Sequence, residues 1–430
     1  MTIRQEMTVG RRARLPLLVG LGCVLALIAA DMVFVFVRGR DGKAAHGTLT
    51  TVAVGSNPSA IAVDPESGHV FVAGADAGTV RMLDGGAGTM LRAVAVGQDP
   101  SALAVDPATR RVFVCNIDMV SVLDARSGAL AATIPVGANP FGIVVDVPDG
   151  RVFTVNPIDG TVDMLDATTG TVLRRTRVGL RPVSAALDAH TRRLLVADSG
   201  GGAVSVLDAR TNAVVGTVSI GAHTAAVAID ARTGRAVVGY ADSEEENAGL
   251  AGPGLSVVDT GRLAVVRSLG QSQVPHGVAA IAVDERTARA FVVNHNTDAV
   301  AVLDTRTGAL LRTVAVGAHP IAVAVDTRAG HVFVVNLDGH SVSVLDAASG
   351  RLQRTFAVSA TPVAVAVDDA TGQAFVAVSA GGTEQIPDPW RDIPGWVSRG
   401  IQRWLPFLPR PGSYTRTPPP TMVTIDESRL

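Results

Sequence analysis

Residues 320–350 read PIAVAVDTRAGHVFVVNLDGHSVSVLDAASG, and this stretch decides the fold of the chain. It contains three short runs rich in Val, Ile and Phe, at residues 321–326, 331–336 and 341–346, and a fourth run, LQRTFAV, follows at residues 352–358. Each run has the length and the β-branched composition of a strand, and the Asp and Gly residues between them are typical of turns. The stretch therefore predicts four antiparallel strands.

This four-strand pattern recurs along the chain with a regular period. An aspartate ends the first strand of each copy, at Asp64, Asp106, Asp146, Asp188, Asp230, Asp284, Asp326 and Asp368. The intervals are 42, 40, 42, 42, 54, 42 and 42 residues. A period near 42 built from short strands is typical of a closed β-propeller. We predict an all-β protein, an eight-bladed propeller of four-stranded repeats, with seven blades as the alternative if one unit is displaced.

The two ends of the repeat region complement each other. The eighth copy has three strands of its own, VAVAVD, AFVAV and TMVTID, at residues 363–368, 374–378 and 421–426. The missing fourth strand matches LTTVAVG at residues 49–55, which resembles LRTVAVG at residues 311–317. Pairing of these ends in one blade would leave no free sheet edge in the ring. The propeller is therefore predicted to span residues 48–430.

The turns of the repeat carry a D-x-x-x-G pattern, as at Asp326–Gly330 and Asp368–Gly372. An aspartate accepts hydrogen bonds from turn amides, and glycine takes the left-handed backbone conformation. We therefore interpret the repeated aspartates as structural residues and not as acid catalysts.

The second strands end in FVCN (residues 113–116), FTVN (153–156), FVVN (291–294) and FVVN (333–336). These motifs resemble those of the YVTN-type β-propeller repeat proteins, and the resemblance covers residues 48–430. It implies a propeller exposed at the cell surface or in the periplasm, with binding or surface roles. It does not imply one activity, because related propellers also include redox enzymes.

Composition excludes several classes of function. A net charge of −2 and an aromatic content of 4% argue against a nucleic-acid partner. The two cysteines, Cys23 and Cys115, lie in different regions and predict no disulfide framework. Motifs for covalent haem, for a serine nucleophile elbow, for a zinc protease and for a phosphate loop are absent from the sequence. The sequence leaves enzymatic activity open and favours a protein without one.

The N-terminus predicts export. Residues 1–14 are basic, residues 15–37 form an apolar run long enough to cross a membrane, and residues 38–47 form a linker. Four basic residues before the run and three after it favour a cytoplasmic N-terminus. We predict a single-pass signal anchor in the cytoplasmic membrane, with the propeller on the periplasmic or extracellular side. The alternative is a cleaved signal peptide and a secreted protein, with cleavage after Ala30.

Strand directions alternate in an antiparallel blade, so the loops after second and fourth strands share one face, here called the upper face. The turns after first and third strands share the lower face. Both departures from the repeat, at residues 241–254 and 380–420, are upper loops. Binding residues commonly lie on loops held by a rigid scaffold. The upper face is therefore the candidate functional face.

Five histidines fall in one sector of this face. His223, His276 and His319 precede the first strands of three adjacent units, and His295 and His340 follow second strands. Converging imidazoles could hold a divalent transition metal such as Zn, Cu or Fe, so these five residues are a candidate metal site. The alternative is that they are solvated turn residues that replace Asn. No other cofactor is predicted.

Two further sets are candidates for contact with a ligand or partner. Asn294 and Asn336 end second strands and could bind a ligand, or could instead tie their own loops to the backbone. The second insertion holds Trp390, Trp396 and Trp404, and a short amphipathic helix there would place Arg399 and Arg403 on its polar side. Such a helix could bind a partner, cover the channel or contact a membrane.

These observations predict an exported, membrane-anchored propeller that acts as a binding or scaffold module through its upper loops. One alternative is a metal-dependent hydrolase or redox enzyme with a histidine-lined site at the channel mouth. Another is a structural component of the cell surface. The sequence names neither the partner protein nor the small ligand.

Overall fold

The computed structural model of the chain describes residues 51–52, 57–221, 223–241, 253–358, 360–368, 370–379 and 422–425. The predicted segments 1–14, 15–37 and 38–47 lie outside the described residues, as do residues 242–252 and 380–420 of the two predicted insertions. Among the residues that are described, the structure contains no helix that is both long and apolar enough to span a membrane.

Seven sheets are each built from four consecutive strands. The first is β2 (Pro58–Val63), β3 (His69–Gly74), β4 (Thr79–Asp84) and β5 (Thr89–Ala95), and the second is β6 (Ala102–Asp106), β7 (Arg111–Asn116), β8 (Met119–Asp124) and β9 (Leu130–Pro135). The third is β10 (Gly142–Asp146), β11 (Arg151–Asn156), β12 (Thr161–Asp166) and β13 (Val172–Arg177), and the fourth is β14 (Pro182–Asp188), β15 (Arg193–Asp198), β16 (Ala203–Asp208) and β17 (Ala213–Ser219).

The other three follow the same plan. The fifth is β18 (Thr224–Asp230), β19 (Arg235–Tyr240), β20 (Pro253–Asp259) and β21 (Ala264–Gly270). The sixth is β22 (Val278–Asp284), β23 (Arg289–Asn294), β24 (Ala299–Asp304) and β25 (Ala309–Ala315), and the seventh is β26 (Pro320–Asp326), β27 (His331–Asn336), β28 (Ser341–Asp346) and β29 (Leu352–Ala357). Since β20 begins at Pro253, the last two residues of the first predicted insertion belong to a strand.

The remaining sheet is composite and joins the two ends of the repeat region. It contains β30 (Thr361–Asp368), β31 (Gln373–Ser379) and β32 (Met422–Ile425), and β1 (Thr51–Val52) pairs with β32 at its outer edge. The pairing is antiparallel, with Thr51 opposite Val423 and Val52 opposite Met422. With this composite sheet the described residues form eight four-stranded sheets, and the predicted closure of the ends is present.

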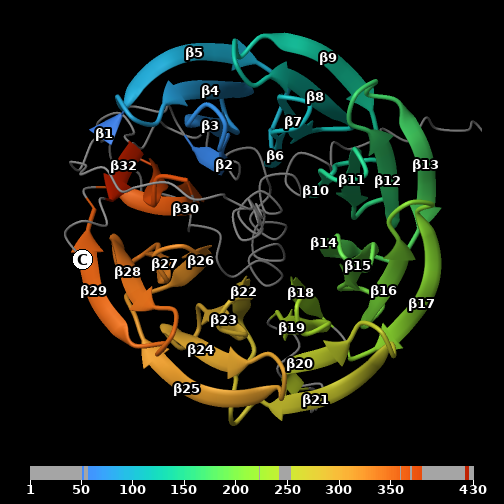
Figure 1. Cartoon of the computed structure of the whole chain (residues 1–430), viewed down its shortest axis with the longest axis vertical. Helices are drawn as coiled ribbons and strands as arrows, with labels where there is room; N and C mark the ends of the chain where they lie inside the picture. The colour runs from blue at the N-terminus through green and yellow to red at the C-terminus, as the bar shows by residue number, and fades with distance from the viewer. Residues whose placement is uncertain are drawn as a thin grey trace, which may run out of the picture.

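The sheets form a ring, with one strand of each sheet near the centre and one at the rim (Figure 1). The inner strands contact one another in cyclic order, from β2 to β6 and onward to β30, and β30 contacts β2. The chain is therefore an all-β propeller, and each sheet is referred to below as a blade, numbered one to eight in the order given.

The hydrophobic core lies between neighbouring blades. A fully buried phenylalanine occupies the middle of most second strands, at Phe71, Phe113, Phe153, Phe291, Phe333 and Phe375. One apolar cluster packs Phe71 of blade one with Leu103 and Val112 of blade two. A similar cluster packs Phe375 of the composite blade with Ile61 of blade one. Burying one such side chain contributes about 1.5–3 kcal/mol, so each interface between blades stabilises the ring.

The outer strands are irregular in the same way in every blade of consecutive strands. The register between third and fourth strands shifts near the lower end, as between Val206 and Leu207 opposite β17. The residue left without an opposite partner faces solvent in most blades, and Leu91, Leu173, Val215, Val266 and Leu311 are between 44% and 50% exposed. These bulges place a belt of apolar side chains around the outer wall.

Candidate functional site

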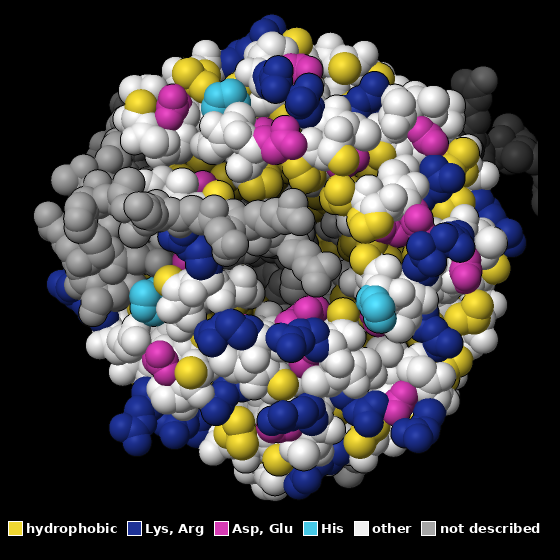
Figure 2. Space-filling view, viewed as in Figure 1, with side chains coloured by type: hydrophobic (Ala, Val, Ile, Leu, Met, Phe, Trp, Pro, Cys, Tyr) yellow, Lys and Arg dark blue, Asp and Glu magenta, His cyan; other side chains and the backbone are white. Residues whose placement is uncertain are grey.

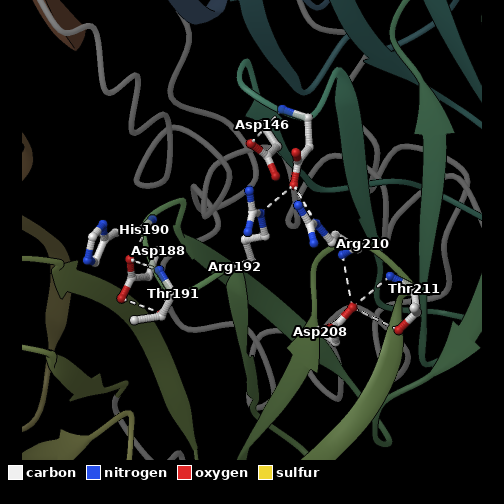
Figure 3. A network of polar contacts seen from close by, with 9 residues as sticks. Asp146, Asp188, His190, Thr191, Arg192, Asp208, Arg210 and Thr211 are labelled. Carbon is white, nitrogen blue, oxygen red and sulfur yellow. Dashed lines mark hydrogen bonds and ion pairs between the residues drawn. The ribbon is translucent and has the colours of Figure 1, made fainter.

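The lower face consists of turns that use their aspartates internally. In the turn after β14, the Asp188 carboxylate accepts hydrogen bonds from the backbone amides of His190 (2.9 Å) and Thr191 (3.0 Å) and from the Thr191 hydroxyl (2.6 Å) (Figure 3). In the turn after β8, hydrogen bonds from the Ser127 side chain and amide lower the pKa of Asp124. These carboxylates are occupied hydrogen-bond acceptors, which confirms their structural role.

Ion pairs link neighbouring blades on the same face. The Asp149 carboxylate of blade three receives Arg192 Nε at 2.9 Å and Arg210 Nε at 3.4 Å, both from blade four. Partial burial would raise the pKa of Asp149, but the two arginines lower it. The face drawn in Figure 2 carries a broken ring of Arg side chains with Asp and Glu between them, as expected for the lower turns.

The wall of the central hollow is apolar. Hydrophobic side chains border the upper and right-hand rim of the hollow in Figure 2, and half-buried wall residues include Val144, Val145, Leu187 and Val325. The inner strands as described contain no Lys, Arg, His or Glu, and their aspartates stand at the strand ends, in the lower turns. The described wall therefore offers no side chain suited to general acid–base chemistry.

Backbone conformation explains most of the polar residues at the channel mouth. Asn57, Asp99, Asn139, His223 and His319 each precede an inner strand and have φ between 48° and 63°. Asn, Asp and His are the residues other than Gly that most often tolerate this left-handed region. The conformation gives His223 and His319 a structural reason to be there, as replacements for Asn.

The structure brings some of the predicted histidines together in pairs. The rings of His295 and His319 stack with centroids 5.3 Å apart, and His319 Nδ1 lies 3.4 Å from the Asp338 carboxylate. The His276 ring stacks instead on Tyr240 at 6.3 Å. Among the residues described, no three His, Cys, Asp or Glu side chains are placed to hold a metal ion. The five-histidine site stays a prediction.

The two predicted asparagines lie beneath the loops and not on their surface. Asn294 is 2% exposed, and its amide nitrogen donates to the carbonyls of Pro275 (2.8 Å) and His276 (3.1 Å). Asn336 is fully buried and donates to the hydroxyls of Ser341 (3.1 Å) and Ser343 (3.0 Å). These contacts favour the reading in which each side chain fastens its own loop. The predicted contacts of Trp390, Trp396, Trp404, Arg399 and Arg403 lie outside the described residues.

A group of exposed apolar residues, which sequence reasoning missed, lies on the upper face of blades two to four. Ile117 is 41% exposed, Met119 36%, Ile158 49% and Leu180 68%. We call these four residues the upper patch. The corresponding loops of blades one, four and six contain Ala77, Gly200 and Thr297. That contrast between repeats was the available signal.

The patch is bordered by aspartates. Asp118 accepts a hydrogen bond from the Asn139 amide at 3.1 Å, and Asp159 accepts one from the Ala138 amide at 2.8 Å. Burial, and then the nearby Asp76 carboxylate, raise the pKa of Asp99. The described upper loops contain six aspartates and one arginine, Asp76, Asp99, Asp118, Asp159, Asp298, Asp338 and Arg181, a formal charge of −5 with neutral histidines.

Comparisons with known proteins support the fold of this chain and nothing beyond it. No protein-family model and no curated protein sequence matches the chain. Among solved structures 1665 chains match, a number that indicates a common architecture. One is hydrazine synthase of Kuenenia stuttgartiensis, with a TM-score of 0.53 and 15% identity over 80% of this chain and 96% of that one. At that identity the likeness shows the fold alone.

Proposed function

We propose that this chain is an exported binding or scaffold module, anchored in a membrane by residues 15–37, that holds a partner protein or a small ligand on its upper face. The FVCN, FTVN and FVVN strand ends support membership of the YVTN-type repeat proteins. The propeller serves as the rigid support from which the upper loops are presented.

The observation that carries this proposal is the difference between the two faces. The lower turns repeat one plan in which carboxylates bind turn amides. The upper face carries the stacked histidines and the upper patch of Ile117, Met119, Ile158 and Leu180, and the strand ends that flank both predicted insertions lie there too. Exposed apolar groups beside charged residues are typical of surfaces that bind another molecule.

The direction of β1 supports access to this face. Because β1 is antiparallel to β32, which runs from the upper to the lower side, the chain before Thr51 approaches from the lower side. An anchor at residues 15–37 would then hold the lower face toward the membrane. The upper face would point away from the membrane, toward partners.

The second insertion also leads to the upper face. It leaves β31 at Ser379 and returns to β32 at Met422, and both positions are at upper strand ends. We propose Trp390, Trp396 and Trp404, with Arg399 and Arg403, as partner contacts on that segment. Removing residues 387–411 is expected to leave a folded propeller that has lost these contacts, and undiminished capture of the partner by the truncated chain would refute their role.

Site-specific photo-crosslinking tests the proposal as a whole. A photoreactive amino acid would replace Ile158 or Asp338 on the upper face, and Arg232 or Arg306 on the lower face as matched exposed controls. In the cells that make the protein, we expect discrete adducts from the upper positions and not from the lower ones. Equal adducts from both faces, or none from the upper positions, would contradict an upper binding face.

A metal-dependent hydrolase or redox enzyme is the second candidate. The observation that favours it is the approach of His295, His319 and Asp338 in blades six and seven. Metal analysis of the purified full chain is the test. A stoichiometric transition metal that is lost in the His319→Ala variant would support the enzyme, and a metal-free protein with unchanged behaviour in that variant would exclude this site.

A further inference from the structure

The loops that carry the upper patch are joined to one another across three blades. The Ile117 amide donates to the Gln98 carbonyl at 3.2 Å, which joins the loop of blade two to the connection that enters it. Asp118 and Asp159 bind the adjacent amides of Asn139 and Ala138, which joins blade two to blade three. Gly160, which follows Asp159, lies against the backbone of Gly179 and Leu180. The four apolar residues therefore lie on connected loops of neighbouring blades.

The four apolar side chains of the upper patch take no part in the packing between blades. The hydrophobic clusters between blades two, three and four are complete without it and contain none of the four residues. The corresponding loops of blades one and four carry small residues such as Ala77 and Gly200, and Leu337 in the loop of blade seven packs against the core. Leaving apolar side chains in water opposes folding, so their grouping points to a partner that covers them.

The surrounding charge selects the chemistry of that partner. Asp118 and Asp159 each use one carboxylate oxygen on a backbone amide, which fixes both groups beside the apolar residues. Asp99 adds a third carboxylate, whose pKa is raised first by burial and then by the neighbouring Asp76, and a cation arriving beside it would favour its charged form. Arg181 is the single arginine of the described upper loops. Phosphate-rich partners are repelled here, and cationic ones are attracted.

We propose that the upper patch binds a segment of a partner protein in which apolar side chains alternate with Lys or Arg. This inference rests on the proposed binding function and names the class of partner. An extended chain places alternate side chains on opposite sides with a rise of about 3.3 Å per residue, so one apolar row would contact Ile117, Ile158 and Leu180 in turn. The basic side chains would project from the other side of the bound strand, where the negative field of Asp99, Asp118 and Asp159 would attract them.

The test uses the purified full chain in a non-ionic detergent and a fluorescent 12-residue peptide that alternates Leu and Lys. Fluorescence anisotropy gives its affinity for the wild type and for two double variants, Ile158→Ser with Leu180→Ser and Asp118→Asn with Asp159→Asn. Asn retains an oxygen for the backbone amide, so the second variant removes charge and keeps the loops. The matched control is Leu173→Ser with Val215→Ser, which alters equally exposed apolar residues of the outer wall.

We expect the serine pair to weaken binding at least tenfold, the asparagine pair to weaken it and reduce its dependence on salt, and the control pair to leave it unchanged. Equal binding by both upper-patch variants and the wild type would overturn the inference. So would equal binding of a peptide that alternates Ser and Lys, because attraction would then be purely ionic. Binding that requires prior removal of residues 387–411 would also overturn it, since the chain's own segment would then be the occupant.

The two proposals fail in different ways. Photo-crosslinks from the upper face without affinity for the Leu–Lys peptide would retain the binding face and reject the basic partner. Absence of both would reject the binding face itself.

Discussion

Each lower turn is stabilised by the carboxylate of a single aspartate, and removing that carboxylate should lower the free energy of unfolding. Asp188 is fully buried and accepts two backbone amides and a hydroxyl. In Asp188→Ala those donors lose their acceptor, so we expect the free energy of unfolding to fall by about 2–3 kcal/mol. Urea denaturation followed by circular dichroism measures this change. Asp188→Asn keeps one oxygen and should lose clearly less, and equal losses would show that the turn does not depend on these bonds.

The same turns make stability depend on pH. The Ser127 hydroxyl and amide each donate to Asp124 at 2.7 Å and lower its pKa. A carboxylate with a lowered pKa stabilises the folded state above its ordinary pKa, about 3.9, and loses that contribution as pH falls through the lowered value. Ser127→Ala should therefore be less stable than the wild type at pH 7.

The difference between these two proteins should shrink as the pH falls below about 4, the ordinary pKa of an aspartate. Thermal denaturation of both at several pH values measures it. A difference that stays constant down to pH 2 would mean that Ser127 acts through packing and not through the Asp124 charge.

Residue identity predicted these turns because Asp and Gly have specific backbone roles. It did not predict the roles of the histidines equally well. His223 and His319 look like metal ligands in a linear sequence, while their positive φ values show that they also serve the backbone. The upper patch was missed because Ile117 and Ile158 are single apolar residues in loops, where no strand or helix period exposes them.

A buried side chain of one blade can form a hydrogen bond to the connection that leads into that blade. Ser121 on β8 is fully buried, donates to the Val96 carbonyl at 2.5 Å and accepts from the Asn116 amide at 2.9 Å. Val96 belongs to the connection from β5 to β6. Ser121→Ala would remove the donor to the buried Val96 carbonyl and leave the Asn116 side-chain amide with only the Val114 carbonyl at 3.2 Å, so we expect a loss of about 1–3 kcal/mol in the free energy of unfolding. Exposed Ser219→Ala is the control and should change stability little.

Strand positions followed closely from the sequence because second and third strands carry regular apolar runs. The predicted runs 331–336 and 341–346 coincide with β27 and β28. The outer strands were less predictable, because the bulges put adjacent residues such as Val214 and Val215 on the same exposed wall. A bulge depends on the twist of the completed sheet, which a local pattern does not contain.

Closure of the ring can be tested by a covalent link. In Thr51→Cys with Val423→Cys the two cysteines would stand opposite each other on β1 and β32. We expect a disulfide to form and to stabilise the folded state by roughly 5 kcal/mol in the chain-entropy model, because the closed loop is longer than 100 residues. Mass spectrometry and the change in melting temperature measure both effects.

Burial of Cys115 raises the pKa of its thiol, so this native cysteine should not compete for the link. Thr51→Cys with Ile425→Cys is the control, since Ile425 lies two residues further along β32. Linking of the control pair as efficiently as the designed pair would show that the two ends are not held in the register described.

The architecture was predictable because the period and the matching ends constrain a closed ring strongly. The proposed binding face was not, because it consists of residues in which the repeats differ, and each difference occurs once. Ile158 and Leu180 become parts of one surface only because the ring places blades three and four beside each other. Fold information is repeated along this sequence, and binding information is not.

The pairing of β1 with β32 also determines which sheet is completed last during biosynthesis. The ribosome makes β1 before the other strands of the ring and β32 after them, so no nascent chain can complete the eighth sheet before β32 has been synthesised. Until then the apolar flanks of blade one and of the growing end remain open, and such surfaces promote aggregation. A chaperone or rapid passage through a translocon would protect these surfaces. The last step of maturation would be the pairing of β1 with β32, after all the other strands of the ring have been made.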